Sequence, residues 1–304
     1  QNLDIIASYR PRHIVILAGD HVYKMDYARM LADHVDSGAP CTVACIEVSR
    51  EDARDFGVIA IDERRRVTGF VEKPADPPGL PHDPDRSLAS MGVYVFTADY
   101  LYEALRLDME QADSSHDFGK DVLPRALEDG RRLFAYDFAR NPIPGQEGPN
   151  TYWRDVGTLD SYWEANMDLV AVKPQFDLYN EEWPLRTSAE YSPPAKFVHE
   201  EESRTGRAVN SLVAGGVIIS GATVRSSVAF RRVRVNSYST VENCVLFDNV
   251  TIGRNCHIVN TIIDKNVQVP DGTRIGFDPI EDKLRGFTVM PSGIVTVPKS
   301  YVFR

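Results

Sequence analysis

The stretch VNSYSTVENCVLFDNVTI (235–252) is followed by IGRNCHIVNTIIDKNVQV (252–269), and apolar residues recur in both at steps of five or six. The same spacing extends to both sides and gives eleven apolar positions: Ile218, Val224, Ala229, Val235, Val241, Leu246, Ile252, Ile258, Ile263, Val269 and Ile275. A period near six is typical of a β-helix, in which every coil places one short strand on each of three faces. We therefore predict a parallel β-helix in the last third of the chain.

The steps add up to a repeat of 17 residues, which aligns Ile218, Val235, Ile252 and Val269 in one column. Three more columns follow the same repeat: Val228, Val245 and Ile262; Val233, Val250 and Val267; Ser226, Asn243 and Asn260. A coil with three equal six-residue faces would be one residue longer, so one face is consistently short. We expect the coils to stack Val and Ile in a ladder along their common axis.

Residues 1–172 have a different texture, because short apolar runs alternate with amphipathic segments. The pattern predicts strands at 13–20, 41–48, 89–96 and 132–138, and a hairpin over 56–74 that turns near Glu63–Arg65. Helices are expected at 24–37, 98–107, 117–130 and 160–171. This alternation predicts an α/β domain with a mixed, mostly parallel sheet.

Residues 173–210 contain four prolines and no clear period, as expected for a connection between domains: Pro174, Pro184, Pro193 and Pro194. We therefore expect three parts, namely a first domain at 1–172, a connection at 173–210 and the β-helix at 211–304.

The composition is that of a globular protein, with 43% hydrophobic and 26% charged residues among 304. Acidic residues number 44 and basic residues 34, which gives a net charge of −10. Nucleic-acid binding needs clustered Lys and Arg, so the balance argues against a nucleic-acid partner. No apolar run is long enough to cross a bilayer, so we expect no membrane association.

Four cysteines lie inside apolar, strand-like runs: Cys41, Cys45, Cys244 and Cys256. Their spacing matches neither a zinc motif nor a small disulfide framework. We interpret them as buried thiols of a protein in the reducing cytoplasm.

Polar residues at the ends of apolar runs are candidates for a ligand site, because ligands of parallel α/β sheets bind beyond the carboxyl ends of strands. Asp20 follows Gly19 at the end of the first run, and Glu72 and Lys73 end the second strand of the hairpin. A Glu accepts hydrogen bonds from sugar hydroxyls, and a Lys attracts anions. The alternatives are a helix-capping Asp20 and a solvated ion pair of Glu72 with Lys73.

Other candidates lie near strand and helix starts. Ser90 and Tyr94 belong to the expected strand 89–96, where plain core packing is the alternative for Tyr94. Asp117 lies at the start of an expected helix, where capping is the simpler interpretation. Asp155 precedes the helix expected at 160–171. Asp20 and Asp155 are a candidate pair of carboxylates for one Mg²⁺, which prefers one or two carboxylates plus phosphate oxygens; whether they meet stays open at this point.

The chain lacks the glycine-rich phosphate loops GxGxxG and GxxxxGK[ST], a His/Cys metal cluster and a GxSxG motif. A nucleotide enzyme without such a loop is either incomplete or of another kind.

Six segments together closely resemble the bacterial glucose-1-phosphate adenylyltransferase family: LAGDHVYKMDY (17–27), FGVIAID (56–62), FVEKP (70–74), ASMGVYVF (89–96), HDFGKDVLP (116–124) and YWRDVGTLDSYWEAN (152–166). PPAKFV (193–198), NSLVAGG (210–216) and VRVNS (233–237) resemble the family's C-terminal left-handed β-helix. The resemblance covers nearly the whole chain and implies a Rossmann-like nucleotidyltransferase domain before that β-helix.

The resemblance implies that ATP and α-D-glucose 1-phosphate are converted into ADP-glucose and pyrophosphate for glycogen synthesis, with Mg²⁺ as cofactor. It places the metal-binding catalytic residues at Asp20 and Asp155 and the sugar-phosphate lysine at Lys73. Glu72 matches the residue that binds the glucose hydroxyls. Further sugar-site positions fall on these residues: Gly57, Ser90, Tyr94, Asp117, Phe118 and Trp153.

The resemblance also implies a homotetramer regulated by an anionic sugar-phosphate activator and an AMP-type inhibitor. Two of the family's basic effector positions align with Lys265 and Lys299. Both are Arg in the family pattern, and Lys lacks the bidentate geometry of Arg, so the identity of the effector stays open. A cluster of four arginines could join such a site, although solvated coil corners are the simpler interpretation: Arg225, Arg231, Arg232 and Arg234.

The family's nucleotide domain opens with a glycine-rich loop, which this chain does not contain. We therefore expect that the N-terminal part of that domain is missing and that the chain alone is inactive. Two alternatives stay open: a catalytically silent regulatory subunit of the same fold, and a hexose-1-phosphate nucleotidyltransferase that uses another nucleotide. The presence of Asp20 and Lys73 weighs against the silent subunit.

Overall fold

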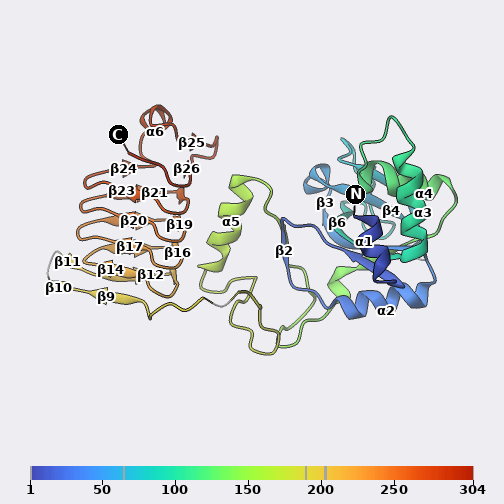
Figure 1. Cartoon of the computed structure of the whole chain (residues 1–304), viewed down its shortest axis with the longest axis horizontal. Helices are drawn as coiled ribbons and strands as arrows, with labels where there is room; N and C mark the ends of the chain where they lie inside the picture. Colours follow the sequence, from blue (N-terminus) through green and yellow to red (C-terminus); the bar gives the residue numbers. More distant parts are fainter. Residues whose placement is uncertain (1, 64–65, 189, 202–203, 304) are drawn as a thin grey trace. The chain divides into compact units, whose positions relative to one another are not determined.

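The computed structural model describes residues 2–63, 66–188, 190–201 and 204–303. They form two compact units, the first ending at Trp153 and the second beginning at Arg154 (Figure 1). The second unit thus includes α5 (Leu159–Leu169), which the sequence analysis assigns to the first domain.

The first unit is built around a sheet with the strand order β5–β4–β6–β3–β7, in which β1 pairs with β6. The strands have these bounds: β1 (His13–Ile16), β3 (Cys41–Ser49), β4 (Gly57–Ile61), β5 (Val67–Glu72), β6 (Arg86–Thr97) and β7 (Leu133–Asp137). Two short strands lie outside it, β2 (His21–Tyr23) and β8 (Trp153–Asp155), and α1 (Leu3–Ser8) precedes β1. The predicted turn at Glu63–Arg65 falls partly on residues 64–65, outside the described residues.

The sheet is mixed, as predicted, but the expected predominance of parallel pairs is wrong for its described strands. Only β3 and β7 run parallel there, whereas the pairs β1–β6, β3–β6, β4–β5 and β4–β6 are antiparallel. One physical reason is the short connection between β4 and β5, which contains no α-helix and reverses the strand direction.

Helices cover both faces of this sheet. Along β6, Leu88 and Phe96 pack in one apolar cluster with side chains of α3 (Ala98–Met109) and α4 (Leu123–Glu128). Met91 and Val95 point to the opposite face and pack with Met30 of α2 (Tyr27–Ser37). The alternation of β6 side chains therefore produces a three-layer α/β unit.

Local chemistry explains where the helices begin and end. Asp26 caps α2 by accepting from the Ala28 amide at 3.0 Å, and Gly38 ends the helix with a φ of 60°. The expected helix over 117–130 divides into a π-helical turn, Phe118–Val122, and α4, which has Pro124 in its first turn. Short 3₁₀ turns lie at Asp52–Asp55 and Phe138–Arg140.

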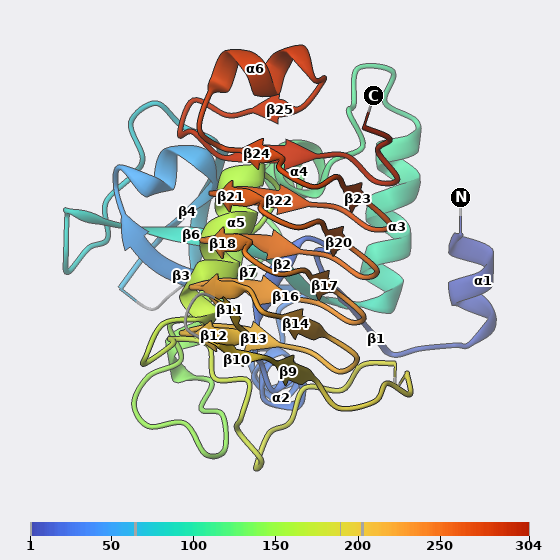
Figure 2. The same cartoon turned by 90° about the vertical axis from the view of Figure 1, so that its left-hand side faces the viewer.

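The second unit is a parallel β-helix, with strands stacked in three ladders (Figure 2). One ladder contains β12 (Arg207–Val209), β15 (Thr223–Arg225), β18 (Thr240–Glu242), β21 (His257–Val259) and β24 (Arg274–Ile275). The second contains β13 (Leu212–Val213), β16 (Val228–Ala229), β19 (Val245–Leu246), β22 (Thr261–Ile263) and β26 (Val295–Val297), with β25 (Thr288–Val289) antiparallel at its end. The third contains β9 (Lys196–Val198), β14 (Ile218–Ser220), β17 (Arg234–Val235), β20 (Thr251–Ile252) and β23 (Gln268–Val269).

The ladders already begin within the stretch 173–210 that the sequence analysis assigns to a connection, because β9 and β12 lie there. A small hairpin, β10 (Glu200–Glu201) with β11 (Arg204–Thr205), separates these two strands.

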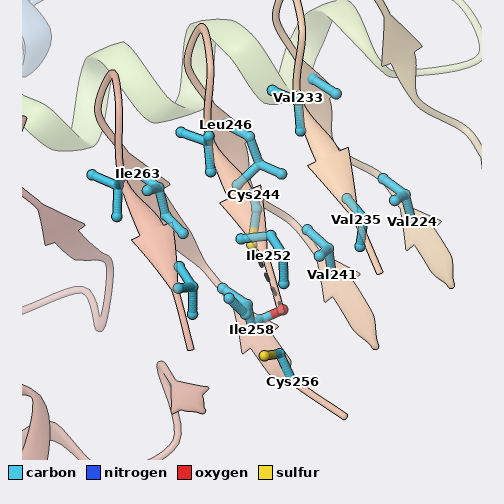
Figure 3. Close-up of a cluster of buried hydrophobic side chains, with 14 of the residues drawn as sticks. Val224, Val233, Val235, Val241, Cys244, Leu246, Ile252, Cys256, Ile258 and Ile263 are labelled. Atoms are coloured by element: carbon cyan, nitrogen blue, oxygen red, sulfur yellow. Dashed lines mark hydrogen bonds between the residues drawn. The ribbon is translucent and has the colours of Figure 1, made fainter. Parts of the chain in front are cut away.

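The predicted axial ladder of apolar side chains is present in the core of the coils (Figure 3). Val235, Ile252 and Val269 pair in register, which confirms that column. The assignment of Ile218 to the same column is wrong, because Ile219 pairs with Val235 and is fully buried. The coil from Ile219 to Val235 is one residue shorter than the coil from Val235 to Ile252, because its turn at Gly221, a glycine with a φ of 64°, is one residue shorter.

The corners between the strands are built from residues with left-handed backbone. Ser226, Asn243 and Asn260 have φ values of 44°, 53° and 47°, which explains the column that aligns them in sequence. Asn249 and Asn266 form a second such corner, where the Asn249 side-chain amide donates to the Asn266 side-chain oxygen at 3.0 Å. Asn is among the few residues that adopt this conformation readily.

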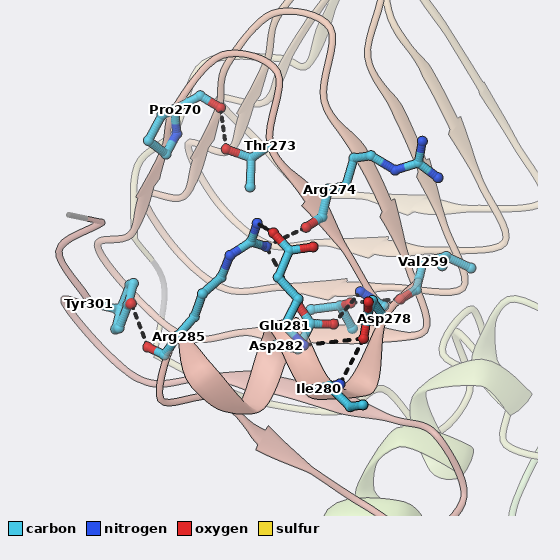
Figure 4. A network of polar contacts seen from close by, with 12 residues as sticks. Val259, Pro270, Thr273, Arg274, Asp278, Ile280, Glu281, Asp282, Arg285 and Tyr301 are labelled. Carbon is cyan, nitrogen blue, oxygen red and sulfur yellow. Dashed lines mark hydrogen bonds and ion pairs between the residues drawn. The ribbon is translucent and has the colours of Figure 1, made fainter.

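The helix α6 (Pro279–Leu284) covers the last coil (Figure 4). Its Asp282 is buried, accepts from the Gly276 amide at 2.8 Å and lies 3.5 Å from the Arg285 guanidinium. Burial raises the pKa of Asp282, whereas the Gly276 amide and Arg285 act in the opposite direction. Arg285 also donates to Glu281 and to the Arg274 carbonyl. These hydrogen bonds connect the end of α6 to β24 of the last coil.

None of the helices in the described part of the chain has the length and apolar character needed to cross a bilayer. The four cysteines are free and buried, as predicted.

Candidate functional site

The first part of the candidate site surrounds the carboxylate of Glu72, at the end of β5. Gly57 pairs with Glu72 across the β4–β5 hairpin. A methyl group on Gly57 would lie 2.7 Å from Glu72 Oε2 and 2.6 Å from Phe70 Cζ, and one on Gly119 would lie 2.9 Å from the same oxygen. Two glycines, one of them the predicted site residue Gly57, therefore leave room for this half-buried carboxylate.

The environment of Glu72 favours its protonated form. Burial and the neighbouring charge of Asp117 raise the pKa of Glu72, while Lys73 and Lys120 partly offset this. Two carboxylates, predicted separately as sugar-site residues, are thus brought close enough to interact. A pair of acceptors beside two lysines suits a ligand that has both hydroxyls and negative charge.

Asp117 is held by the backbone of the π-helical turn. Its carboxylate accepts from the amides of Gly119 and Lys120 at 2.8 and 2.9 Å, which confirms the capping interpretation. Its own amide donates to Asp121 at 3.0 Å. Capping and a role in the site are compatible here, because the side chain stays exposed.

Ser90, Tyr94 and Phe118 form the adjoining wall. The rings of Tyr94 and Phe118 stack with centroids 5.5 Å apart, and Tyr94 is buried. Burial raises the pKa of Tyr94 to about 12, whereas a hydrogen bond with Ser90 lowers it. Tyr94 packs in the core, as the simpler interpretation holds. The negative charges of Asp117 and Glu72 also contribute to its raised pKa.

A disturbance in β6 lies beside this wall. Cys45 pairs with Ser90 while Val43 pairs with Tyr94, so β6 has extra residues between these pairs. Gly92, in this segment, has a φ of 66°, and its amide donates to Ser90 Oγ at 3.3 Å. Such irregularities re-aim side chains and are frequent next to active sites.

Lys73 leaves β5 in a left-handed conformation with a φ of 47°, and its amide donates to the Phe56 carbonyl at 3.0 Å. Its side chain is exposed, whereas that of Glu72 is half-buried. The backbone thus separates the two neighbours, and no ion pair between them is recorded among the described residues, contrary to the alternative of a simple surface pair.

A line of rings connects this region to Asp20. Trp153 is buried, and its ring lies 5.0 Å from that of Phe56 on one side and 5.0 Å from that of His21 on the other. His21 Nδ1 lies 2.8 Å from the Met91 carbonyl, and its Nε2 lies 3.7 Å from the carboxylate of Asp20. Asp20 is exposed.

Asp155 belongs to the second unit, so its predicted meeting with Asp20 stays a prediction. Its carboxylate is half-buried and accepts from the Gly157 amide at 2.8 Å. Within the described residues no three His, Cys, Asp or Glu side chains gather in a metal-binding group. Two oxygen donors fit Mg²⁺, because this ion takes one or two carboxylates and completes its shell with water and phosphate.

The two lysines predicted as effector ligands lie on neighbouring segments of the last coils. Lys265 and Lys299 are both exposed, and the amide of Ser300, next to Lys299, donates to the Lys265 carbonyl at 2.9 Å. Of the four arginines, Arg231 is neutralised by Glu190 at 2.9 Å and by Asp248 at 3.4 Å.

His21, Phe56 and Gly119 also line this region, although the sequence does not predict them as site residues. His21 directly follows Asp20, and Phe56 precedes Gly57, so both stand inside segments already quoted. Nothing in a single sequence shows that their rings meet at Trp153, because that contact joins distant segments.

Comparisons with known proteins find two family models that match this chain. Residues 1–172 match the sequence model of the family described as nucleotidyl transferase, and residues 193–297 match that described as GlmU-like, C-terminal hexapeptide. The hexapeptide match agrees with the predicted left-handed form of the β-helix.

Curated relatives align with the whole chain. The glucose-1-phosphate adenylyltransferase of Thermus thermophilus is 58% identical over 100% of this chain and 73% of its own length. The enzyme of the same name from Deinococcus deserti is 54% identical over 100% of this chain and 73% of its own. That from Bradyrhizobium diazoefficiens is 50% identical over 100% and 72%. The chain belongs to the glucose-1-phosphate adenylyltransferase family.

Proposed function

We propose that the protein transfers an adenylyl group from ATP to α-D-glucose 1-phosphate, which gives ADP-glucose and pyrophosphate for glycogen synthesis. The observation that carries this proposal is the group of acceptors and rings around Glu72, at positions where the family places its sugar site. Its relatives carry the name of this reaction over the full length of the chain.

In this proposal the sugar occupies the space that Gly57 leaves beside Glu72. Glu72 and Asp117 accept hydrogen bonds from glucose hydroxyls, and ionised carboxylates are strong acceptors for them. Ser90, Tyr94, Phe118 and Trp153 complete the pocket, with aromatic rings suited to the apolar face of a sugar. Binding of hydroxyls replaces the water that Glu72 loses on burial.

Lys73 holds the phosphate of the sugar. Its exposed ammonium group reaches outward from a backbone fixed by the Phe56 carbonyl. A positive charge there lowers the repulsion between the two phosphorylated substrates, which must approach each other for in-line attack. Little proton transfer is needed, so positioning and charge neutralisation supply most of the catalysis.

Asp20 and Asp155 hold the divalent metal on which nucleotidyl transferases of this family generally depend, and we propose Mg²⁺. When bound, the ion would supply positive charge beside the attacking phosphate oxygen of the sugar phosphate and the α-phosphate of ATP. The contact of Asp20 with His21, and of Asp155 with the Gly157 amide, orients both carboxylates in advance.

We further propose a cytoplasmic homotetramer, because the thiols are free and buried and the family resemblance implies four subunits. Lys265 and Lys299 bind an anionic effector of the sugar-phosphate activator or AMP type. Their closeness on adjacent segments supports a shared anion site.

The test measures the activity of the complete gene product with glucose 1-phosphate and, in turn, ATP, GTP, UTP and dTTP. The rate of pyrophosphate release is the readout. We expect turnover with ATP, and we expect Asp20→Asn to lower kcat by roughly 100-fold or more. Lys73→Ala should raise the KM for glucose 1-phosphate about tenfold to a hundredfold.

The matched controls are Asp113→Asn and Lys196→Ala, which change exposed residues outside the site. Wild-type rates for Asp20→Asn would refute the assigned role of Asp20. Preference for another nucleotide would support the alternative substrate class, and effector binding without turnover would support a silent regulatory subunit.

A further inference from the structure

One face of the β-helix is apolar on its outside. In the ladder that contains β16, β19 and β22, the residues Val228, Val245 and Ile262 form the outward column, while their neighbours Ala229, Leu246 and Ile263 fill the core. All three outward side chains are nonetheless buried. Other side chains must therefore cover them.

The covering element is α5, which lies along the coils in Figure 2. Leu159, Tyr162, Trp163 and Met167 of α5 pack in one apolar cluster with Val245 and Ile262. The Tyr162 ring stacks on that of Phe247 at 6.1 Å. The helix is thus seated on the regulatory β-helix and belongs to the same compact unit.

Two polar contacts fix the position of α5 on this face. The indole Nε1 of Trp163 donates to the Asn243 carbonyl at 2.9 Å. Near the start of the helix, Ser292 Oγ donates to the Asp160 carboxylate at 2.5 Å. Hydrophobic packing alone permits sliding, whereas a directional bond at two points defines where the helix starts.

A short, hydrogen-bonded segment joins Asp155 to the start of α5. Asp155 accepts from the Gly157 amide, and the next residue, Thr158, is the helix cap. Thr158 and Ser161 form a capping box, with each side chain bonded to the other's backbone amide at 3.2 Å or less. Only Val156 and Gly157 stand between the carboxylate and a fully capped helix.

We infer that α5 is the positioning element for Asp155, and that Trp163 and Asp160 are positioning residues that hold it against the β-helix. The inference rests on the proposed function, because it treats Asp155 as a metal ligand. In this arrangement the regulatory domain holds one of the two metal-binding carboxylates of the reaction.

The competing explanation is that the contacts of α5 only stabilise the β-helix. The two explanations differ in what happens near Asp155. If the contacts position the carboxylate, then their loss loosens the Asp155–Gly157 hydrogen bond and weakens metal binding. If they only stabilise, then the unfolding temperature changes and the local structure at Asp155 does not.

The first experiment uses Trp163→Phe and Ser292→Ala in the complete gene product, each of which removes one donor. Hydrogen exchange of the Gly157 amide reports on its bond to Asp155, and electron paramagnetic resonance of Mn²⁺ in the presence of ADP-glucose reports on the metal. We expect faster exchange at Gly157 and a Mn²⁺ half-saturation raised roughly threefold to tenfold in each variant, as for the loss of one hydrogen bond. Trp183→Phe is the matched control, since Trp183 lies outside α5 and the β-helix strands.

A reversible staple gives an independent test. The pair Asp160→Cys and Ser292→Cys places two thiols at the existing contact, and the four native cysteines are buried and therefore remain inert. We expect the oxidised staple to bind Mn²⁺ like the wild type and the reduced form to bind it several-fold more weakly.

An unchanged Mn²⁺ half-saturation in Trp163→Phe, Ser292→Ala and the reduced double variant would overturn the inference, even if exchange at Gly157 rises. Failure of the proposed function is distinguishable from this result. In that case Asp155→Asn would also leave Mn²⁺ binding unchanged, or the wild type would not transfer an adenylyl group.

Discussion

Glu72 lies where the stability of the fold and the proposed binding of sugar favour different side chains. Its carboxylate lies beside Asp117, in space that exists because Gly57 and Gly119 have no side chain. Folding would be served better by a neutral group there, since burial and a like charge both disfavour the anion. We attribute the retained Glu to sugar binding, because sites for ligands commonly hold groups that cost stability.

Glu72→Gln is therefore expected to separate stability from binding. The raised pKa of Glu72 means that its contribution to stability is fully present below its unfolded-state pKa and is lost as pH rises through the folded pKa. At pH 7.5 the variant should melt about 1–3 °C higher than the wild type. This difference should vanish as the pH is lowered toward the pKa of an unperturbed Glu side chain. Its KM for glucose 1-phosphate should rise roughly tenfold.

Melting curves between pH 4.5 and 7.5, with initial rates at each pH, measure both effects. Glu51→Gln changes an exposed carboxylate and serves as the control. The melting temperature of the variant minus that of the wild type should therefore rise with pH. A fall of this difference between acidic pH and pH 7.5 would contradict the assignment of the pKa shift.

At the residue scale, chain position predicts part of the site. Asp20, Glu72 and Lys73 end apolar runs, and this alone made them candidates. The closeness of Glu72 to Asp117 and the line from Asp20 through His21 to Trp153 depend on long-range packing, so a single sequence without its fold does not contain them. The pairing of Asp20 with Asp155 stays a prediction.

At the scale of elements, the corners of the β-helix explain why its repeat is so regular. Each turn needs a residue with left-handed backbone, and Asn fills many of these positions: Asn210, Asn243, Asn249, Asn255, Asn260 and Asn266. An L-residue with an ordinary side chain pays about 1–2 kcal/mol for this conformation, whereas Gly does not. The backbone therefore favours Asn and Gly at the corners, while the core favours Val and Ile.

Asn266→Ala should lower the stability of the protein by about 1 kcal/mol more than Asn266→Gly does. Both variants lose the side-chain bond to Asn249, so the difference between them isolates the backbone conformation. The midpoints of thermal unfolding of the two variants measure it. Gln268→Ala, at an exposed strand position, is the control and should change stability by less than about 0.5 kcal/mol; equal midpoints for Ala and Gly would count against this account.

The elements differ in how well the sequence predicts them. The β-helix was predictable because its core repeats, and the end of α2 because Gly38 follows it; its start at Tyr27, after the Asp26 cap, lies three residues later than predicted. The direction of the strands in the first sheet was not, since a strand reads the same whichever way its neighbour runs. The shorter coil from Ile219 to Val235 escaped detection because Ile218 and Ile219 are both apolar, and only the register shows which one points inward.

At the scale of the whole molecule, the units defined by contacts do not coincide with the parts suggested by sequence texture. The helix 159–169 follows the first domain in pattern but packs on the β-helix. The sequence does contain a trace of this, because Val228, Val245 and Ile262 make an outward column apolar where solvent would favour polar residues. Such a column predicts a covering element without telling which one it is.

We expect the complete gene product to be a homotetramer, as proposed from the family resemblance. Light scattering coupled to size-exclusion chromatography should give a mass of four subunits at micromolar concentration. A monomer under those conditions would refute the proposal, and a dilution series would show whether a smaller species accompanies loss of activity.

The strands that seat α5 also lead directly to the proposed effector lysines. Lys265 follows β22 after one residue, and Lys299 follows β26 after one residue, while Asp160 contacts Ser292 just before β26. Two ligands whose binding is coupled are linked by reciprocity: if an anion at Lys265 and Lys299 changes the affinity of the metal at Asp155 by some factor, the metal must change the affinity of the anion by the same factor. The concentration of free Mg²⁺ would then set how strongly the enzyme senses its effector, so that the metal acts as a second regulatory signal.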